Sequence, residues 1–183
     1  MTVSILDFVL SGQDYPAISD VARVALEAGV SDSEAALALS GAWAQVEGFT
    51  GRVYRAHDAV LVVEASGPDV IRWPRRPFPT SIMADWHDGE GWTAGHGVIV
   101  GGLVEVPHKA KWRFTATGIS GSPVGDHVVQ AVANLALYGL IWAPTRREFS
   151  HQSAGDTSIT REPLKGSMWA SGAGALLASE VVL

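Results

Sequence analysis

Hydrophobic residues recur at helical spacing in two stretches near the start of the chain. The first, residues 15–29, has Pro16 in its first turn, ends at Gly29, and carries an apolar face made of Ile18, Val21, Ala22 and Ala25. The second follows SDSE at residues 31–34, a capping-box pattern in which a hydroxyl and a carboxylate satisfy free amide hydrogens. Its apolar stripe consists of Leu39, Trp43, Val46 and Phe49. The pattern predicts that residues 1–51 supply the amino-terminal helices of a core.

The period then changes to short runs rich in β-branched and aromatic residues. These runs are VLVVEAS, DVIRWP, TSIMADWH, GVIV, LVEVP and WRFTATG, with SGPD, DGEG and GG between them. They predict a small antiparallel β insertion over residues 52–122. Within it, WPRRPFP at residues 73–79 is expected to be an extended arm or an edge, because its three prolines have no amide hydrogen to donate.

Helical spacing returns in residues 123–144. Asp126 is the expected cap, Pro144 the expected end, and the apolar face consists of Val128, Val132, Leu135 and Ala136. Because VVQAVANLALYGLIW is apolar almost all round, it is expected to be the central buried helix. Residues 145–183 are expected to form a polar arm that ends in a short helix. The predicted class is α+β: a mainly helical core of three to four helices, a small antiparallel β insertion and an extended C-terminal arm.

Composition supports a globular protein of one domain, or a core with one insertion. The 183 residues are 47% hydrophobic and 17% charged, which is enough apolar material for a core. There is no cysteine, which excludes disulfides, thiol catalysis and cysteine-ligated zinc, and suits a reducing cytoplasm. The first ten residues lack the basic region of a signal peptide, and no run approaches the roughly 20 apolar residues that span a bilayer, so no membrane contact is expected.

Negative charge is concentrated at the amino end. Residues 1–51 hold seven acidic side chains and one basic one, Arg23, so 7 minus 1 accounts for the whole net charge of −6. The other 12 acidic and 12 basic side chains cancel. Such a balance is not typical of a duplex-binding module, which neutralises phosphates with Lys and Arg.

Three stretches contain residue types that occur in catalytic or metal sites. Asp85, His87, Asp88, Glu90 and His96 have the donor types of a metal site, although a hairpin turn with solvated carboxylates explains the same residues and the glycines among them. GISGS at residues 118–122 approaches a nucleophile elbow but ends in Ser, and a turn before a helix explains it better. His127 and Asp126 would not face each other on a helix. Neither a catalytic residue, a metal nor a cofactor is predicted.

Basic residues cluster beside tryptophans, at Trp73 and at Trp112. The groups are Arg72, Arg75 and Arg76; Lys109, Lys111 and Arg113; and Arg146 and Arg147. Arg next to an aromatic ring can support stacking on nucleic-acid bases. Solvated charges, or salt bridges to an acidic neighbouring subunit, are the simpler interpretation.

The order of the segments resembles that of a known family. SDSEAALALSGAWAQVEGFTGRVY looks like a helix that ends in an aromatic-Thr-Gly-Arg turn, and VIRWPRRPFPTSIMADWHDGEGW like an apolar-Pro-Arg segment leading into a hairpin. MWASGAGALLASEVV looks like a closing small-residue element. In this order they resemble the head–tail adaptor (connector) proteins of long-tailed bacteriophages and gene transfer agents. The polar stretch APTRREFSHQSAGDTSITREPLKGS departs from the family pattern.

The resemblance implies a non-enzymatic virion protein, assembled in the host bacterial cytoplasm. It would form a neck ring of about twelve copies between the portal protein and the stopper or tail terminator, and double-stranded DNA would pass without specific binding. Acidic residues would face the channel: Asp20, Glu27, Asp32 and Glu34. Interface candidates are Arg72, Trp73, Arg75, Arg76, Arg146, Arg147, Met168, Trp169, Leu176 and Leu177.

The closing segment is expected to be an interaction element that is poorly ordered in an isolated monomer. Three alternatives stay open. They are another neck or tail-completion protein, a small metal-dependent hydrolase that uses the Asp85–His96 region, and a nucleic-acid-binding module.

Overall fold

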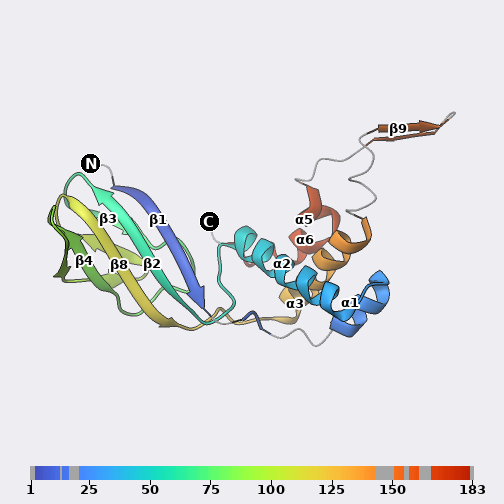
Figure 1. Ribbon diagram of the computed structural model, residues 1–183, viewed down its shortest axis with the longest axis horizontal. Helices are drawn as coiled ribbons and strands as arrows, with labels where there is room; N and C mark the ends of the chain where they lie inside the picture. Colours follow the sequence, from blue (N-terminus) through green and yellow to red (C-terminus); the bar gives the residue numbers. More distant parts are fainter. Residues whose placement is uncertain are drawn as a thin grey trace. The chain divides into compact units, whose positions relative to one another are not determined.

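The computed structural model describes residues 3–12, 14–16, 21–142, 151–154, 157–160 and 166–181 (Figure 1). The chain divides into two compact units. The sheet unit consists of residues 1–14 and 51–123, and the helical unit consists of residues 15–50 and 124–183.

Two antiparallel sheets build the sheet unit. Five strands follow the order β1-β2-β8-β4-β5, where the strands are β1 (Val3–Gly12), β2 (His57–Ala65), β8 (Ala110–Ile119), β4 (Met83–His87) and β5 (Trp92–Gly95). Three shorter strands follow the order β3-β7-β6, where the strands are β3 (Asp69–Arg72), β7 (Leu103–Val106) and β6 (Ile99–Val100). The antiparallel β unit predicted from the alternating runs is therefore present.

The core of the sheet unit comes from residues that alternate along the strands. Every second side chain is buried along β2, and along β8 as far as Ala116, which is the period of two that a strand imposes. These side chains meet those of the three-stranded sheet in one apolar cluster, whose largest buried members are Trp73, Trp112, Phe114, Leu61, Val104 and Val106.

The sequence predicted a mainly helical fold in which residues 1–51 supply the amino-terminal helices. This prediction is wrong for the first residues of the chain. Residues 3–12 form β1, which pairs with β2 along its length, with a bulge between Ile5 and Asp7. Ile5 and Leu6 are consecutive apolar residues, so the sequence lacks the alternation that would have indicated a strand, and the bulge accommodates the extra residue. With β1 in place, the sheets are a larger share of this α+β fold than a small insertion.

The helical unit contains α1 (Val21–Ala28), α2 (Asp32–Thr50) and α3 (Asp126–Leu137), which continues into a π-helical turn, η1 (Tyr138–Trp142). The capping box before α2 is confirmed. The Ser31 hydroxyl and amide donate to the Glu34 carboxylate at 2.7 and 3.0 Å, and the Glu34 amide donates back to the hydroxyl at 3.4 Å. Leu39, Trp43 and Val46 of the predicted stripe are buried. No helix in the described part of the chain is long and apolar enough to cross a membrane.

The central helix is confirmed in its burial but not in its cap. Val128, Val132 and Leu135 of α3 are buried, as the nearly continuous apolar sequence predicted. Gly125 rather than Asp126 occupies the N-cap position, and no side chain caps the helix. Asp126 lies in the first turn, where its charge still interacts favourably with the helix dipole.

The predicted helical end of the chain is present, but residues 166–181 pack within the helical unit and do not extend as an arm. Residues 166–181 include α5 (Ser167–Ala170) and α6 (Ala173–Leu176), and α6 packs against α3. Ala173 and Leu177 are fully buried, and the imidazole Nε2 of His127 on α3 lies 2.9 Å from Oε1 of Glu180. Between the two short helices Gly172 adopts a left-handed conformation with φ of 77°, which turns the chain sharply. The segment is part of the helical unit.

Two further strands, β9 (His151–Ala154) and β10 (Thr157–Thr160), form an antiparallel hairpin. They lie within the polar stretch that the sequence analysis treated as an arm.

Candidate interaction surfaces

The Arg-rich segment after β3 is anchored through its backbone. Trp73 donates its amide to the Gly102 carbonyl at 2.7 Å, Arg76 donates to the Gly51 carbonyl at 3.1 Å, and Val53 donates to the Arg76 carbonyl at 2.7 Å. The segment is thus an irregular edge held against its own unit, consistent with the expectation drawn from its prolines.

Its side chains divide into buried and accessible ones. Trp73, an interface candidate, is only 1% exposed and meets Phe8 edge to face at 5.9 Å, so its ring belongs to the core of the sheet unit. Arg72 is exposed, Arg75 and Arg76 are half-buried, and the Arg76 guanidinium lies 5.2 Å from the centre of the Phe78 ring. Of this group, the three arginines are more exposed than the tryptophan.

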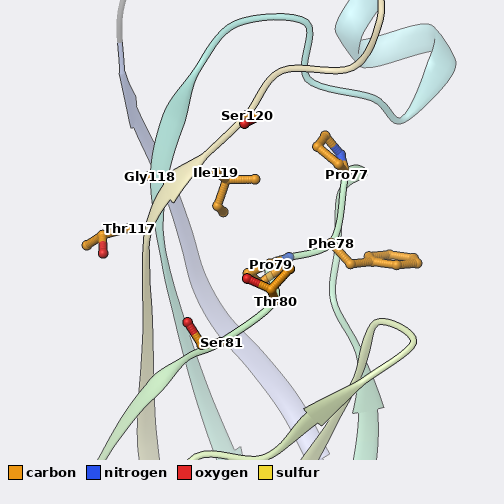
Figure 2. Close-up of a pocket in the computed structure, with 9 residues that line it drawn as sticks. All are labelled: Pro77, Phe78, Pro79, Thr80, Ser81, Thr117, Gly118, Ile119 and Ser120. Atoms are coloured by element: carbon orange, nitrogen blue, oxygen red, sulfur yellow. The ribbon is translucent and has the colours of Figure 1, made fainter.

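A shallow pocket of about 210 Å³ lies next to this segment, between residues 77–81 and the end of β8 at residues 117–120. Figure 2 shows the Ile119 side chain pointing from the end of β8 toward the Pro77–Pro79 segment. Four hydroxyl groups, those of Thr80, Ser81, Thr117 and Ser120, come from its lining residues. Gly118 and Ile119 of the GISGS stretch are the last two residues of β8, and the chain leaves the sheet after them. Gly118 has a left-handed conformation, and its amide donates to Asp58 Oδ1 at 2.7 Å.

A more apolar hollow of about 530 Å³ lies on the three-stranded sheet. Val70, Val100 and Leu103 are 55%, 72% and 49% exposed there, and Asp69 and Glu105 contribute acidic groups to its lining. Exposed β-branched and leucine side chains on a sheet face are a common feature of protein interfaces. None of these residues stands out in the sequence as an interface candidate, because an exposed valine in a strand has the same sequence pattern as a buried one.

Asp85 and His87, which have the donor types of a metal site, are engaged in other interactions. Asp85 Oδ2 accepts hydrogen bonds from Arg113 Nη2 at 2.7 Å and Nε at 3.1 Å, and the Arg113 guanidinium lies 4.6 Å from the centre of the Trp92 ring. His87 meets Trp92 edge to face at 5.4 Å. Among the described residues, no group of three His, Asp or Glu side chains is arranged to hold a metal ion.

Asp88 organises the hairpin turn that was the alternative explanation for this region. Its carboxylate accepts hydrogen bonds from the amides of Gly91 and Glu90 and from the Thr93 hydroxyl, each at 2.9 Å. These bonds, with the Gly91 amide contributing most, lower the pKa of Asp88 to about 2. The carboxylate thus stabilises the turn, with Gly89 at a φ of 106° in the same turn.

The acidic candidates of the helical unit lie on exposed surface. Glu27 pairs with Arg23 one helical turn away at 3.1 Å, and both side chains are about half exposed. Asp32 and Glu34 occupy the first turn of α2, where hydrogen bonds from Ser31 lower the pKa of Glu34. Asp20 lies outside the described residues. The structure keeps three of the four candidates at the surface.

The C-terminal candidates are also split between core and surface. Leu177 is fully buried, whereas Met168 and Leu176 are half-buried. Trp169 is 61% exposed, although its ring meets Phe49 of α2 edge to face at 6.0 Å and covers Gly174. Arg146 and Arg147 lie outside the described residues. Trp169 is therefore the largest exposed apolar side chain among these C-terminal candidates.

Comparison with known proteins places this fold. No protein-family model and no curated protein matches the chain. Among solved structures, it resembles a chain from the neck of an empty gene transfer agent particle computed with C6 symmetry, at a TM-score of 0.55 and 18% identity over 96% of both chains. A chain from the virion of a native gene transfer agent particle matches at a TM-score of 0.53 and 18% identity, over 100% of this chain and 96% of that one.

A third chain, from the neck of a native gene transfer agent particle computed with C12 symmetry, matches at a TM-score of 0.50 and 19% identity over 96% of both chains. All three matches extend over nearly the whole length of each chain, so both units and their order in the sequence are shared. The chain has the fold of gene transfer agent neck components, in agreement with its resemblance to the head–tail adaptor family.

Proposed function

We propose that this protein is a structural component of a virion neck, a head–tail adaptor that forms a ring between the portal protein and the stopper or tail terminator. The observation that carries the proposal is the shared fold, which extends over 96% of this chain and of a gene transfer agent neck chain. A likeness confined to one unit would support only a common module. Here both units and their interleaved chain order match.

A ring of twelve copies is the proposed assembly. The matched necks are described with C6 and C12 symmetry, and twelve copies satisfy both, because a twelvefold ring contains the sixfold rotations. The ring would assemble in the host bacterial cytoplasm and be retained in the virion.

Passage of double-stranded DNA requires a wall that does not retain phosphates. Exposed Glu27, Asp32 and Glu34 give the helical unit a surface that repels the DNA backbone. We therefore assign these acidic side chains to the channel.

The exposed Trp169, flanked by half-buried Met168, gives the helical unit an apolar contact for the portal protein. A large aromatic side chain that is already ordered by packing loses little conformational freedom on binding and is a typical interface anchor. The arginines at positions 72, 75 and 76 are assigned to contacts with acidic surfaces of neighbouring copies or of the partner.

The decisive experiment mixes the purified chain with portal protein and images the product by negative-stain electron microscopy. We expect a ring of this protein on one end of the portal, and we expect Trp169→Ala to weaken the complex at least about tenfold, as an interface anchor does. Leu26→Ala is the matched control, because Leu26 is 84% exposed on α1 and has no assigned contact. Binding to a tail terminator but not to portal would instead identify another neck protein. Binding to neither would refute the proposal.

A further inference from the structure

The first strand of the five-stranded sheet has an open edge. In the described part of the chain, β1 pairs with β2 on one side and with no strand on the other. Beyond its bulge, residues Asp7–Gly12 pair with His57–Val62 in unbroken register, so this six-residue stretch is regular enough to accept another strand. Proteins normally protect such an edge with proline, lysine or an inward-facing charge. β1 has no Pro or Lys, and Asp7 is its only charge.

Apolar side chains accompany this open edge. Ile5, Leu6 and Val9 are 53%, 49% and 49% exposed. A long edge strand with exposed apolar residues pairs readily with another chain. The strand is therefore suited to binding an added strand.

The hairpin of β9 and β10 lacks a third strand among the described residues. Its four residue pairs, from Thr157–Ala154 to Thr160–His151, form a sheet of only two strands, and no described strand adds a third. A two-stranded hairpin is marginally stable in water, and a third strand is what such a hairpin needs.

Charge favours the same partnership. β1 and β2 carry Asp7, Asp58 and Glu64 and no Lys or Arg. The hairpin lies within residues 145–165, which contain four basic and three acidic side chains. Arg147 precedes β9 in the sequence, and Arg161 follows β10. An acidic sheet edge and a net basic hairpin segment attract each other.

From these observations we infer that the β9–β10 hairpin of one copy adds to the β1 edge of a second copy. This inference deepens the proposed function, because it names the contact between subunits of the proposed ring. The two surfaces are different, so the contact is head to tail, and repetition of a head-to-tail contact produces a closed ring when the rotation allows. Main-chain hydrogen bonds would provide the affinity, as in other cases of strand addition.

Cysteine cross-linking tests the contact directly, because the native chain contains no cysteine. Val9→Cys and Ser158→Cys in one full-length chain, treated with a flexible bis-maleimide, should give dimers and larger species on a denaturing gel. Mixing the two single variants should give dimers that contain one chain of each. The control pair, Leu26→Cys with Ser158→Cys, should remain monomeric, since Leu26 is exposed on α1. A cross-linked monomer, or no cross-link, would overturn the inference.

Charge reversal gives a second measurement. In the V9C/S158C chain, Asp7→Lys should lower the yield of cross-linked dimer several-fold, whereas Glu105→Lys, an equal change at an exposed position of β7, should not. Equal yields for the two variants would contradict the role of the acidic edge. Imaging of the same samples separates this inference from the proposed function. Rings that form without the cross-link would overturn the strand contact alone. Cross-linked oligomers that neither form rings nor bind portal would overturn the proposed ring.

Discussion

At the scale of single residues, short-range hydrogen bonds decide where the chain turns. Asp88 is fully ionised above about pH 4 and accepts three hydrogen bonds in the β4–β5 turn. Because its pKa is lowered from 3.8 to about 2 in the folded chain, its charge stabilises folding above pH 3.8, and this contribution disappears as the pH falls through 2.

Replacing Asp88 with Asn should therefore lower the urea midpoint near neutral pH and have a diminishing effect between pH 4 and pH 2. Urea titrations of both proteins across this range measure the difference. Glu90→Gln is the control, since it removes an exposed charge from the same turn without removing these hydrogen bonds. A difference that does not change with pH would show that the carboxylate charge is not what holds the turn.

The capping box makes a second prediction at this scale. Ser31→Ala removes the hydroxyl that joins Glu34 to the start of α2, and loss of an N-cap side chain costs about 1 kcal/mol. Chemical denaturation of the helical unit, followed by far-ultraviolet circular dichroism, measures the free energy of unfolding. Ser40→Ala in the exposed middle of α2 should be neutral or slightly stabilising, because Ala favours helix more than Ser does. Equal effects of the two substitutions would argue against the cap.

Local signals also explain which residues the sequence identified. SDSE and the stripe of Leu39, Trp43 and Val46 depend on neighbours within two helical turns, so the sequence alone predicts them. Trp73 and Leu177 depend on distant contacts. Their flanking arginines and small residues suggested a surface, whereas Phe8 and α3 supply the packing that buries them. Burial of an isolated large side chain cannot be predicted from composition around it.

At the scale of elements, the connection between β6 and β7 has a steric requirement. Gly102 has φ of 83°, and a Cβ atom there would lie 2.5 Å from the Phe78 ring. Gly101 has φ of 59° but no atom within 4 Å of such a position. Both glycines allow the left-handed turn, and only Gly102 also makes room for Phe78.

Gly101→Ala should thus cost about 1 kcal/mol through backbone strain alone. Gly102→Ala should cost clearly more, because the ring or the turn must also move, and the Gly102 carbonyl that accepts the Trp73 amide moves with it. Free energies of unfolding from urea titration of the two variants test the difference. Similar values would mean that the Phe78 ring relaxes without cost.

The closing segment gives a further prediction for an element. Leu177→Ala should destabilise the helical unit by about 2–5 kcal/mol, because the side chain is fully buried beside α3. Leu26→Ala, at an exposed position, should change stability by less than about 0.5 kcal/mol. Thermal denaturation compares them. Nearly equal thermal midpoints for the two variants would indicate that the closing segment is a loosely attached arm. It also follows that deleting residues 166–183 would damage the helical unit, so loss of assembly in such a deletion would not by itself identify a contact surface.

Element boundaries illustrate the same limit of sequence reasoning. β2 alternates along its length and β8 alternates as far as Ala116, and both were predicted. β1 was missed because the consecutive Ile5 and Leu6 interrupt its alternation and its position at the edge leaves several apolar side chains exposed. Pairing partners that lie 50 residues away, as β2 does for β1, leave no periodic trace in the strand itself. The open edge that carries the subunit contact proposed above was therefore accessible only from the structure.

At the scale of the whole molecule, charge distribution matters more than net charge. The formal charge is −6, and the acidic side chains assigned to the channel lie on α1 and at the start of α2. If these helices line the channel, reversing charges there should cause the ring to retain DNA. If only the net charge matters, charge reversal at any exposed site should have the same effect on DNA retention, because an equal change in net charge alters the nonspecific attraction to DNA equally.

A pair of variants with equal charge separates the two cases. Glu27→Lys with Asp32→Lys, and Glu90→Lys with Glu105→Lys, each shift the formal charge from −6 to −2, and all four positions are exposed. We expect the wild-type ring to bind duplex DNA weakly at physiological salt. The α1–α2 pair should tighten that binding and make it strongly salt-dependent, while the sheet pair should change it little. Fluorescence anisotropy with a labelled duplex at several salt concentrations measures this, after circular dichroism has shown that both variants are folded. Tighter binding by the sheet pair would move the channel to the sheet unit and leave the acidic helices on the outer wall of the ring.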